Sequence, residues 1–252
     1  SQDYGEYTLH EIPPNGQGLA ALIGLGILRN KGLSSHPVDS VDSLHLQIEA
    51  MKLALVDAYR YIADPETMDA TVEQLLDPNY LSARADQIDL SAAGDPGHGV
   101  PAKGGTVYLT AADANGMMVS FIQSNYMGFG SGIVVPETGI SLQNRGSGFV
   151  LQEGHPNQVG PRKRPFQTII PAFLTKGGEP VMSFGLMGGA MQAQGHVQMV
   201  VRLADYGQNP QAAADAPRFQ VLQGRQVAIE ADFSSATLDE LESRGHQLRR
   251  MP

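Results

Sequence analysis

A threonine that follows a glycine, where a linker meets a strand, is the residue of this chain with the clearest chemical use. Gly105-Thr106 stands there, after a Gly/Pro-rich stretch at 86–105 that carries no apolar period. A threonine hydroxyl is a poor nucleophile unless a base lies beside it, and cleavage before Thr106 would supply that base as a new α-amino group. Gly105 leaves its carbonyl carbon open to attack by Thr106. By itself, the pattern also fits an ordinary strand that begins with Gly-Thr.

A second pattern is a pair of potential metal ligands. His45 and Glu49 are four residues apart in a predicted helix and therefore share a face. No third ligand follows at helical spacing, which a metal site would need. We therefore interpret the two residues as an exposed i,i+4 pair and predict no metal site.

Two other kinds of site find little support. The run from Gly128 to Gly132 lacks the lysine and the spacing of a phosphate loop, so we interpret it as a flexible or closely packed loop. The seven histidines show no Ser-His-Asp order, and Ser183 is not part of a G-x-S-x-G motif. We predict neither a conventional serine-hydrolase triad nor a cofactor.

Helices are predicted before the linker. One apolar helix covers 19–30, and a longer one covers 44–62, where apolar residues recur at steps of three, four and seven. Asp64-Pro65 ends the longer helix, and Asp77-Pro78 begins a short polar helix or turn.

After the linker the period changes to two. Residues 106–111 are predicted to form a strand that returns over 117–124 through a turn at Asn115-Gly116. The later elements are a hairpin over 172–175 and 181–184, helices over 197–206, 209–217 and 237–244, and a strand over 227–230. This segregated order predicts an α+β fold rather than alternating βαβ units.

The composition is that of a globular protein. The chain has 252 residues, 42% hydrophobic and 17% charged, with a formal net charge of -9. The acidic balance argues against a nucleic-acid partner, and the absence of cysteine excludes disulfides and thiolate catalysis. We find no signal peptide and no apolar run long enough to span a membrane, which leaves the compartment open between cytoplasm and periplasm.

Seven segments, in order and covering nearly the whole chain, resemble the γ-glutamyltransferase family. They are PPNGQG at 13–18, the H…EA.KLA..D pattern at 45–57, the strand from Thr106 with Gly116, FGSG…GI at 129–140, GP.KRP at 160–165, the glycines at 185 and 188–189, and DAPRF at 215–219.

The resemblance implies a four-layer αββα sandwich of the N-terminal-nucleophile hydrolase type. Thr106 would cleave the chain after Gly105 and then act as the nucleophile that forms an acyl-enzyme. Gly188 and Gly189 match the glycine pair whose amides form the oxyanion hole. Ser124 lies where the family has a second hydroxyl that supports the nucleophile.

The resemblance also implies substrate-binding positions. Gln167 and Thr168 fall on a family Ser-Ser pair near the substrate carboxylate, and Tyr126 replaces a substrate-contacting asparagine. At the family's acidic position for the substrate α-amino group the chain has Gly148, and at the neighbouring Gln/Glu position it has Arg145. The surrounding segment is more like the acylase-type members. We therefore predict a γ-glutamyl or glutaryl-like amide as substrate, with the γ-glutamyltransferase proper as the closest alternative.

The resemblance divides the chain at the cleavage site. Residues 1–105 would be the C-terminal part of a large subunit, and 106–252 most of the small catalytic subunit, together forming one structural domain. The remaining part of the large subunit is the expected protein partner, and a homo-oligomer stays open. The alternative is a non-catalytic, truncated fragment of such an enzyme.

Overall fold

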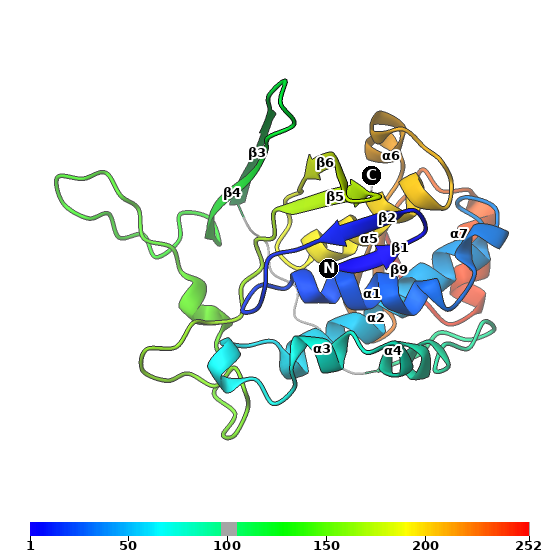
Figure 1. Cartoon of the computed structure of the whole chain (residues 1–252). Coiled ribbons are helices and arrows are strands. Elements are labelled where there is room, and N and C mark those ends of the chain that lie inside the picture. The colour runs from blue at the N-terminus through cyan, green and yellow to red at the C-terminus, as the bar shows by residue number, and fades with distance from the viewer. Residues whose placement is uncertain (97–104, 252) are drawn as a thin grey trace.

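A computed structural model describes residues 1–96 and 105–251 (Figure 1). Part of the predicted processing linker, 97–104, lies outside the described residues. The strands are β1 (Gln2–Tyr4), β2 (Tyr7–His10), β3 (Gly105–Ala112), β4 (Met118–Tyr126), β5 (Ala172–Lys176), β6 (Glu179–Phe184), β7 (Phe219–Gln223), β8 (Gln226–Glu230) and β9 (Gln247–Met251). The α-helices are α1 (Gly18–Arg29), α2 (Val41–Tyr61), α3 (Val72–Leu75), α4 (Pro78–Ala85), α5 (Met191–Ala204), α6 (Pro210–Asp215) and α7 (Ser235–Ser243). Short 3-10 helices cover Leu33–Ser35, Pro65–Thr67 and Arg145–Gly148.

The described strands form three sheets. The first has the order β1-β2-β5-β6, the second is the β3–β4 hairpin, and the third has the order β7-β8-β9. All neighbours are antiparallel except β8 and β9, which run parallel and are connected through α7. This is the single βαβ unit among the described strands, and the expected α+β class is confirmed. The four-layer sandwich stays a prediction.

Helix α1 lies at the centre of the core because its sequence is apolar on nearly every side. It contacts α2, α4, α5 and β1, and its residues from Gly18 to Leu28 are buried. The predicted starts of two other helices are confirmed by their caps. Asp77 accepts hydrogen bonds from Asn79 and Tyr80 ahead of α4, and the Asn209 side chain accepts one from Ala212 in α6. No helix among the described residues is long and apolar enough to cross a membrane.

The β3–β4 hairpin is a separate sheet beside the four-stranded sheet, and the loop that follows it projects away from the body (Figure 1). One face of the hairpin contacts β6: the Thr110 hydroxyl bonds Ser183, and Ser120 Oγ donates to the Phe184 carbonyl at 3.4 Å. A side chain at Gly185 would collide with the Tyr108 ring, since its Cβ would lie 2.6 Å from Tyr108 Cδ2. The glycine therefore permits the close approach that holds the hairpin against this sheet.

The interpretation of His45 and Glu49 as an exposed pair is wrong. Both side chains are buried, and His246, immediately before β9, completes a group of three potential metal ligands with them. The sequence could not show this third residue at helical spacing, because it is 201 positions from His45.

The hydrogen bonds of this group occupy the atoms that a metal would need. Lys52 Nζ donates to Glu49 Oε1 at 2.8 Å and lies 3.5 Å from His246 Nδ1. His246 Nε2 lies 2.8 Å from His45 Nδ1, and His45 Nε2 lies 2.8 Å from the Asp89 carbonyl. Because a carbonyl only accepts, His45 donates from Nε2 and His246 donates to His45, which leaves His246 Nδ1 to accept from the ammonium. These hydrogen bonds satisfy both imidazoles in their neutral form.

This chain of hydrogen bonds predicts that the fold loses stability in acid. Burial, together with the charges of Lys52, His45, Arg244 and Arg225, lowers the pKa of His246 to about 3. The unfolded chain therefore binds a proton near pH 6.5 that the folded chain does not. The contribution of His246 to the free energy of unfolding should be complete above pH 6.5. It should fall by up to about 1.4 kcal/mol per pH unit as the pH drops toward about 3.

Urea unfolding at several pH values measures this slope. Replacing His246 with Gln removes the titrating group while keeping a polar side chain, so the variant should lose less stability between pH 6.5 and 4.5 than the unmodified protein. Equal slopes in the two proteins would contradict the assignment.

Candidate functional site

Thr106 and Ser124 face each other across the β3–β4 hairpin. The register pairs them directly, with an irregularity between Gly105 and Thr106. Thr106 Oγ1 donates to Ser124 Oγ at 3.2 Å, and the Tyr126 amide donates to the same oxygen at 2.9 Å. The pairing therefore orients the Thr106 hydroxyl at the start of β3, directly after the predicted linker. The structure thus brings together Thr106 and Ser124, and their roles as nucleophile and supporting hydroxyl stay predictions.

Gly188 and Gly189 form a tight loop at the start of α5. Their φ angles are 122° and 60°, a region that favours glycine. The Gly188 carbonyl accepts from the Met191 amide, and the Gly189 carbonyl accepts from the Gln192 amide, both at 3.1 Å. In a trans peptide the N–H lies opposite the C=O, so the Gly188 carbonyl that turns into the helix directs the Gly189 amide away from it. An amide with this direction can donate to an oxyanion.

Arg145, Tyr126 and Thr168 meet in one cavity of about 470 Å³. Arg145 Nη1 donates to Thr168 Oγ1 at 3.0 Å, and the guanidinium carbon lies 5.2 Å from the centre of the Tyr126 ring. The Arg145 side chain is buried, and its Nη2 has no hydrogen-bond partner among the described residues. Desolvation lowers the pKa of this guanidinium. A buried guanidinium in the wall of a cavity can bind a carboxylate.

Gly148 lies in the wall of the same cavity, where a side chain would press on the backbone of Phe166. A Cβ at this position would lie 3.0 Å from the Phe166 carbonyl oxygen. Gln167, in contrast, does not line the cavity. Its side-chain oxygen accepts from the Thr168 amide at 3.1 Å, and its backbone pairs with Gly16. Among the described residues, the structure therefore brings Thr168 to the predicted binding site without the side chain of Gln167.

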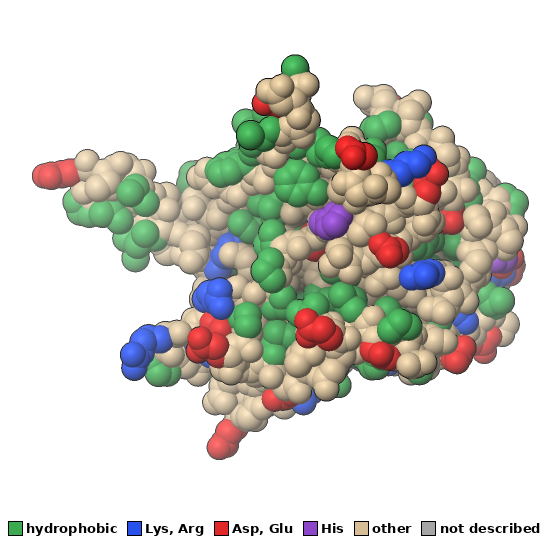
Figure 2. Space-filling model, in the orientation of Figure 1, with side chains coloured by type: hydrophobic (Ala, Val, Ile, Leu, Met, Phe, Trp, Pro, Cys, Tyr) green, Lys and Arg blue, Asp and Glu red, His purple; other side chains and the backbone are tan. Residues whose placement is uncertain are grey.

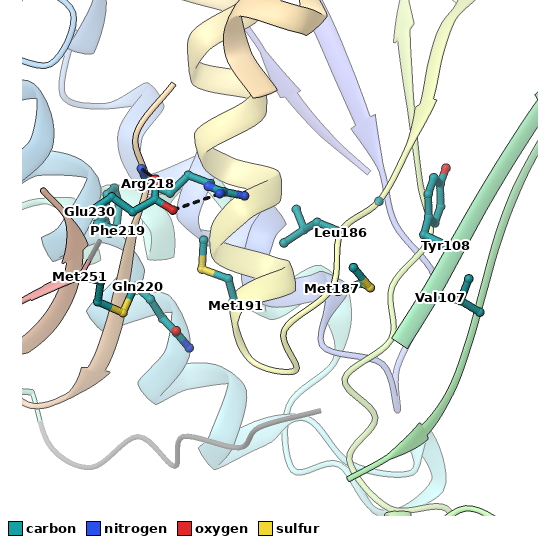
Figure 3. Close-up of a pocket in the computed structure, with 11 residues that line it drawn as sticks. Val107, Tyr108, Leu186, Met187, Met191, Arg218, Phe219, Gln220, Glu230 and Met251 are labelled. Atoms are coloured by element: carbon teal, nitrogen blue, oxygen red, sulfur yellow. Dashed lines mark hydrogen bonds and ion pairs between the residues drawn. The ribbon is translucent and has the colours of Figure 1, made fainter. Parts of the chain in front are cut away.

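A second cavity of about 470 Å³ is lined by residues on both sides of the glycine pair in the sequence (Figure 3). Val107 and Tyr108 of β3 line one side, and Leu186, Met187 and Met191 lie between them and the Arg218–Glu230 ion pair (Figure 3). The hairpin that carries Thr106 thus contributes to both cavities, since Tyr126 lines the first one.

Sequence reasoning gave no role to several residues of this region. Tyr59, Phe149, His155 and Asn157 line the Arg145 cavity, and desolvation lowers the pKa of His155. Gln17, in the PPNGQG segment, bonds the backbone beside both Thr168 and the glycine loop. The resemblance marked the Gln17 segment but gave no function for it, and no sequence period connects these residues.

Comparison with known proteins was consistent with this geometry. Residues 1–252 match the family model described as Gamma-glutamyltranspeptidase. The chain is 38% identical over 253 residues to the glutathione hydrolase-like YwrD proenzyme of Bacillus subtilis, which covers 98% of this chain and 47% of that protein. It is 37% identical to the oxamate amidohydrolase proenzyme of Klebsiella pneumoniae, with 96% and 46% covered. The crystal structure of cephalosporin acylase from Bacillus halodurans matches with a TM-score of 0.92 at 50% identity, over 99% of this chain and 45% of that one.

The fold and the acylase likeness place the chain among the N-terminal-nucleophile hydrolases. The chain belongs to the gamma-glutamyltranspeptidase family, as the sequence resemblance predicted. It spans about half the length of the curated relatives it matches.

The unpaired guanidinium predicts that replacing Arg145 stabilises the fold. Burying a charge without full pairing is costly, so Arg145→Met in the full-length protein should raise the free energy of unfolding by about 1–2 kcal/mol in urea. The matched control is Arg84→Met. Arg84 is also mostly buried but pairs with Asp57 at 2.6 Å, so its loss should lower stability by about 2 kcal/mol or more. Destabilisation by Arg145→Met equal to that of the control would contradict the reading of Nη2 as unpaired.

Proposed function

We propose that the full-length protein is an amidase or acyltransferase that cleaves a glutaryl-like or γ-glutamyl amide through an acyl-enzyme on Thr106. The hydrogen bond from Thr106 Oγ1 to Ser124 Oγ, directly after the predicted linker, carries this proposal. The names of the relatives agree with it, since both are proenzymes of hydrolases. They do not favour the alternative of a non-catalytic fragment.

Before any turnover, the Thr106 hydroxyl attacks the Gly105 carbonyl carbon, and the C–N bond breaks as the Gly105 acyl group shifts to Oγ1. Water then hydrolyses this ester, which leaves a Gly105 carboxylate and frees both Oγ1 and the α-amino group of Thr106. The freed α-amino group of Thr106 then takes the hydroxyl proton as Oγ1 attacks the substrate carbonyl carbon. The amides of Gly188 and Gly189 hold the oxyanion, a contribution of about 3 kcal/mol or more in related sites. Collapse expels the amine, which takes the proton from the α-ammonium. Water or a second amine then releases the acyl group from Oγ1.

The acyl group is recognised by Arg145. Its place in the cavity wall beside Thr168 suits a carboxylate at the far end of the acyl chain. A γ-glutamyl group also carries an α-ammonium, which would lie near this guanidinium with no carboxylate at Gly148 to pair it. A dicarboxylic acyl group such as glutaryl lacks that ammonium and so fits the site better. The γ-glutamyltransferase reaction is the second candidate.

The rest of the polypeptide is the proposed partner of the hairpin. The outer face of β3–β4 exposes Val107, Leu109, Val119 and Phe121, and hydrophobic side chains are visible on the hairpin and on the projecting loop (Figure 2). An apolar face of this kind marks a contact surface. We assign it to the remaining part of the large subunit, which supplies the other half of the relatives' length.

Cleavage before Thr106 is tested by mass spectrometry of the purified full-length protein. The unmodified protein should give two pieces that meet between Gly105 and Thr106, and Thr106→Ala should give a single uncut chain. Thr106→Ser keeps a hydroxyl and should still be cut. Thr110→Ala, on the same face of β3, is the control for damage to the hairpin. Normal cleavage of Thr106→Ala would overturn the assignment.

Substrate preference is tested with p-nitroanilides on the cleaved full-length protein. The glutaryl compound should exceed the γ-glutamyl compound in kcat/KM by about tenfold, or about 1.4 kcal/mol in transition-state binding. Arg145→Met should remove most of the activity toward the glutaryl compound, chiefly by raising KM. A tenfold preference for the γ-glutamyl compound would instead show that another group pairs the ammonium.

A further inference from the structure

Gln17 makes the contacts that join the two functional halves of the site. Its side chain is fully buried, and its Nε2 donates to the Thr168 carbonyl at 2.5 Å and to the Gly189 carbonyl at 2.8 Å. Thr168 holds Arg145, and Gly189 belongs to the proposed oxyanion loop. One amide group therefore bonds the backbone of both segments, which are otherwise about twenty residues apart in sequence.

The backbone around Gln17 fixes it in the same place. The Gln17 amide donates to the Gln167 carbonyl at 2.8 Å, and the Gln167 amide donates to the Asn15 carbonyl at 2.9 Å. Asn15 Nδ2 also donates to the Pro165 carbonyl at 2.6 Å. The segment 15–17 thus runs alongside 165–167 as a short parallel bridge.

The glycines on either side of Gln17 are needed for this approach. A Cβ at Gly16 would lie 2.9 Å from Ile12 Cδ1, and a Cβ at Gly18 would lie 2.6 Å from Glu11 Cβ. The glycines therefore allow the chain to bring the Gln17 amide between two loops where side chains on its neighbours would not fit.

The Gln17 side chain does not cap the helix that it precedes. Gln17 occupies the N-cap position of α1, where Ser, Thr, Asp or Asn would bond the first amides of the helix, and its side chain makes no such bond. The amide is directed at the site instead. Local stability of α1 does not explain the choice of residue here, whereas the contacts to 168 and 189 do.

We propose that Gln17 is a positioning residue that sets the distance between the carboxylate anchor at Arg145 and the oxyanion amides at Gly188 and Gly189. That distance selects the length of the acyl chain, because the far carboxylate and the scissile carbonyl must reach both places at once. The inference rests on the proposed function for its substrate, whereas the connection of the two segments through the Gln17 hydrogen bonds does not. Loss of the Gln17 amide would let the two segments move independently and would weaken the preference for one acyl-chain length.

The first measurement is the chain-length profile of the cleaved full-length protein. It compares kcat/KM for succinyl, glutaryl and adipyl p-nitroanilides in the unmodified protein and in Gln17→Met, which keeps the volume and removes the donor. The unmodified protein should prefer glutaryl. In Gln17→Met the glutaryl value should fall by about tenfold, as expected for one or two lost hydrogen bonds. The kcat/KM values for the succinyl and adipyl compounds should change by less than about threefold, so the preference for glutaryl becomes smaller.

A matched buried glutamine separates positioning from general stability. Gln198 in α5 also donates to two carbonyls, those of Gln194 at 3.2 Å and Phe219 at 3.0 Å, and it does not contact the site. Gln198→Met should lower stability to a similar degree and keep the glutaryl preference. A uniform loss on all three substrates in Gln17→Met, or an unchanged profile, would overturn the proposal.

Amide hydrogen exchange provides a readout that does not depend on activity. Gln17→Met should speed exchange in the peptides that cover 165–168 and 186–190 together, and Gln198→Met should leave both unchanged. If the unmodified protein cleaves none of the three substrates, the proposed function is wrong. The amide exchange rates still test whether the hydrogen bonds of Gln17 hold the two segments together. If exchange in Gln17→Met rises in neither segment, the positioning role is wrong whatever the activity.

Discussion

A buried guanidinium that is only partly satisfied is the constraint on which the site depends. Arg145 bonds Thr168 and faces the Tyr126 ring, and the remaining Nη2 has no described partner. Such an arrangement costs free energy in the absence of a ligand, so surrounding contacts must hold it in place. The Tyr126 amide bonds Ser124, and Ser124 accepts from Thr106. The Arg145 guanidinium is therefore connected to the proposed nucleophile through two residues of β4.

The opposite side of the site depends on backbone geometry rather than charge. Gly188 and Gly189 adopt positive φ angles, and their carbonyls join the first turn of α5. A helix N-terminus adds a partial positive field where an oxyanion would form. Gln17 joins this loop to the Thr168 segment, so the cationic side and the amide side of the site share one buried support.

The elements that the sequence predicted well are those whose pattern is local. Helix α2 has a clear apolar period, and the β3–β4 hairpin combines alternation with Asn115-Gly116. The missed strands β1, β2, β7 and β9 are three to five residues long, and β9 in particular reads as polar. A short strand is specified by its partner, which no local period shows.

The same distinction applies to the candidate site. Thr106 and Arg145 were found through residue type and family resemblance, and the register and cavity now place Ser124, Tyr126 and Thr168 beside them. Gln17 and the His45–His246 pair were missed or misread, because each depends on contacts between segments more than 150 residues apart. The sequence contains both partners of such a contact but nothing that indicates their proximity.

These long-range contacts explain how the chain could be cut before Thr106 without coming apart. The four-stranded sheet pairs β2, from before the cut, with β5, from after it. The buried Glu11–His196 pair at 2.5 Å, the His45–His246 hydrogen bond and the contacts of Gln17 all cross the same point in the sequence. Cleavage would remove one covalent connection from a core that both pieces build together, and the new N-terminus would stay where Ser124 already holds the threonine. The fold therefore separates two requirements that would otherwise conflict: a free α-amino group on Thr106, and a site whose opposite sides come from distant parts of one chain.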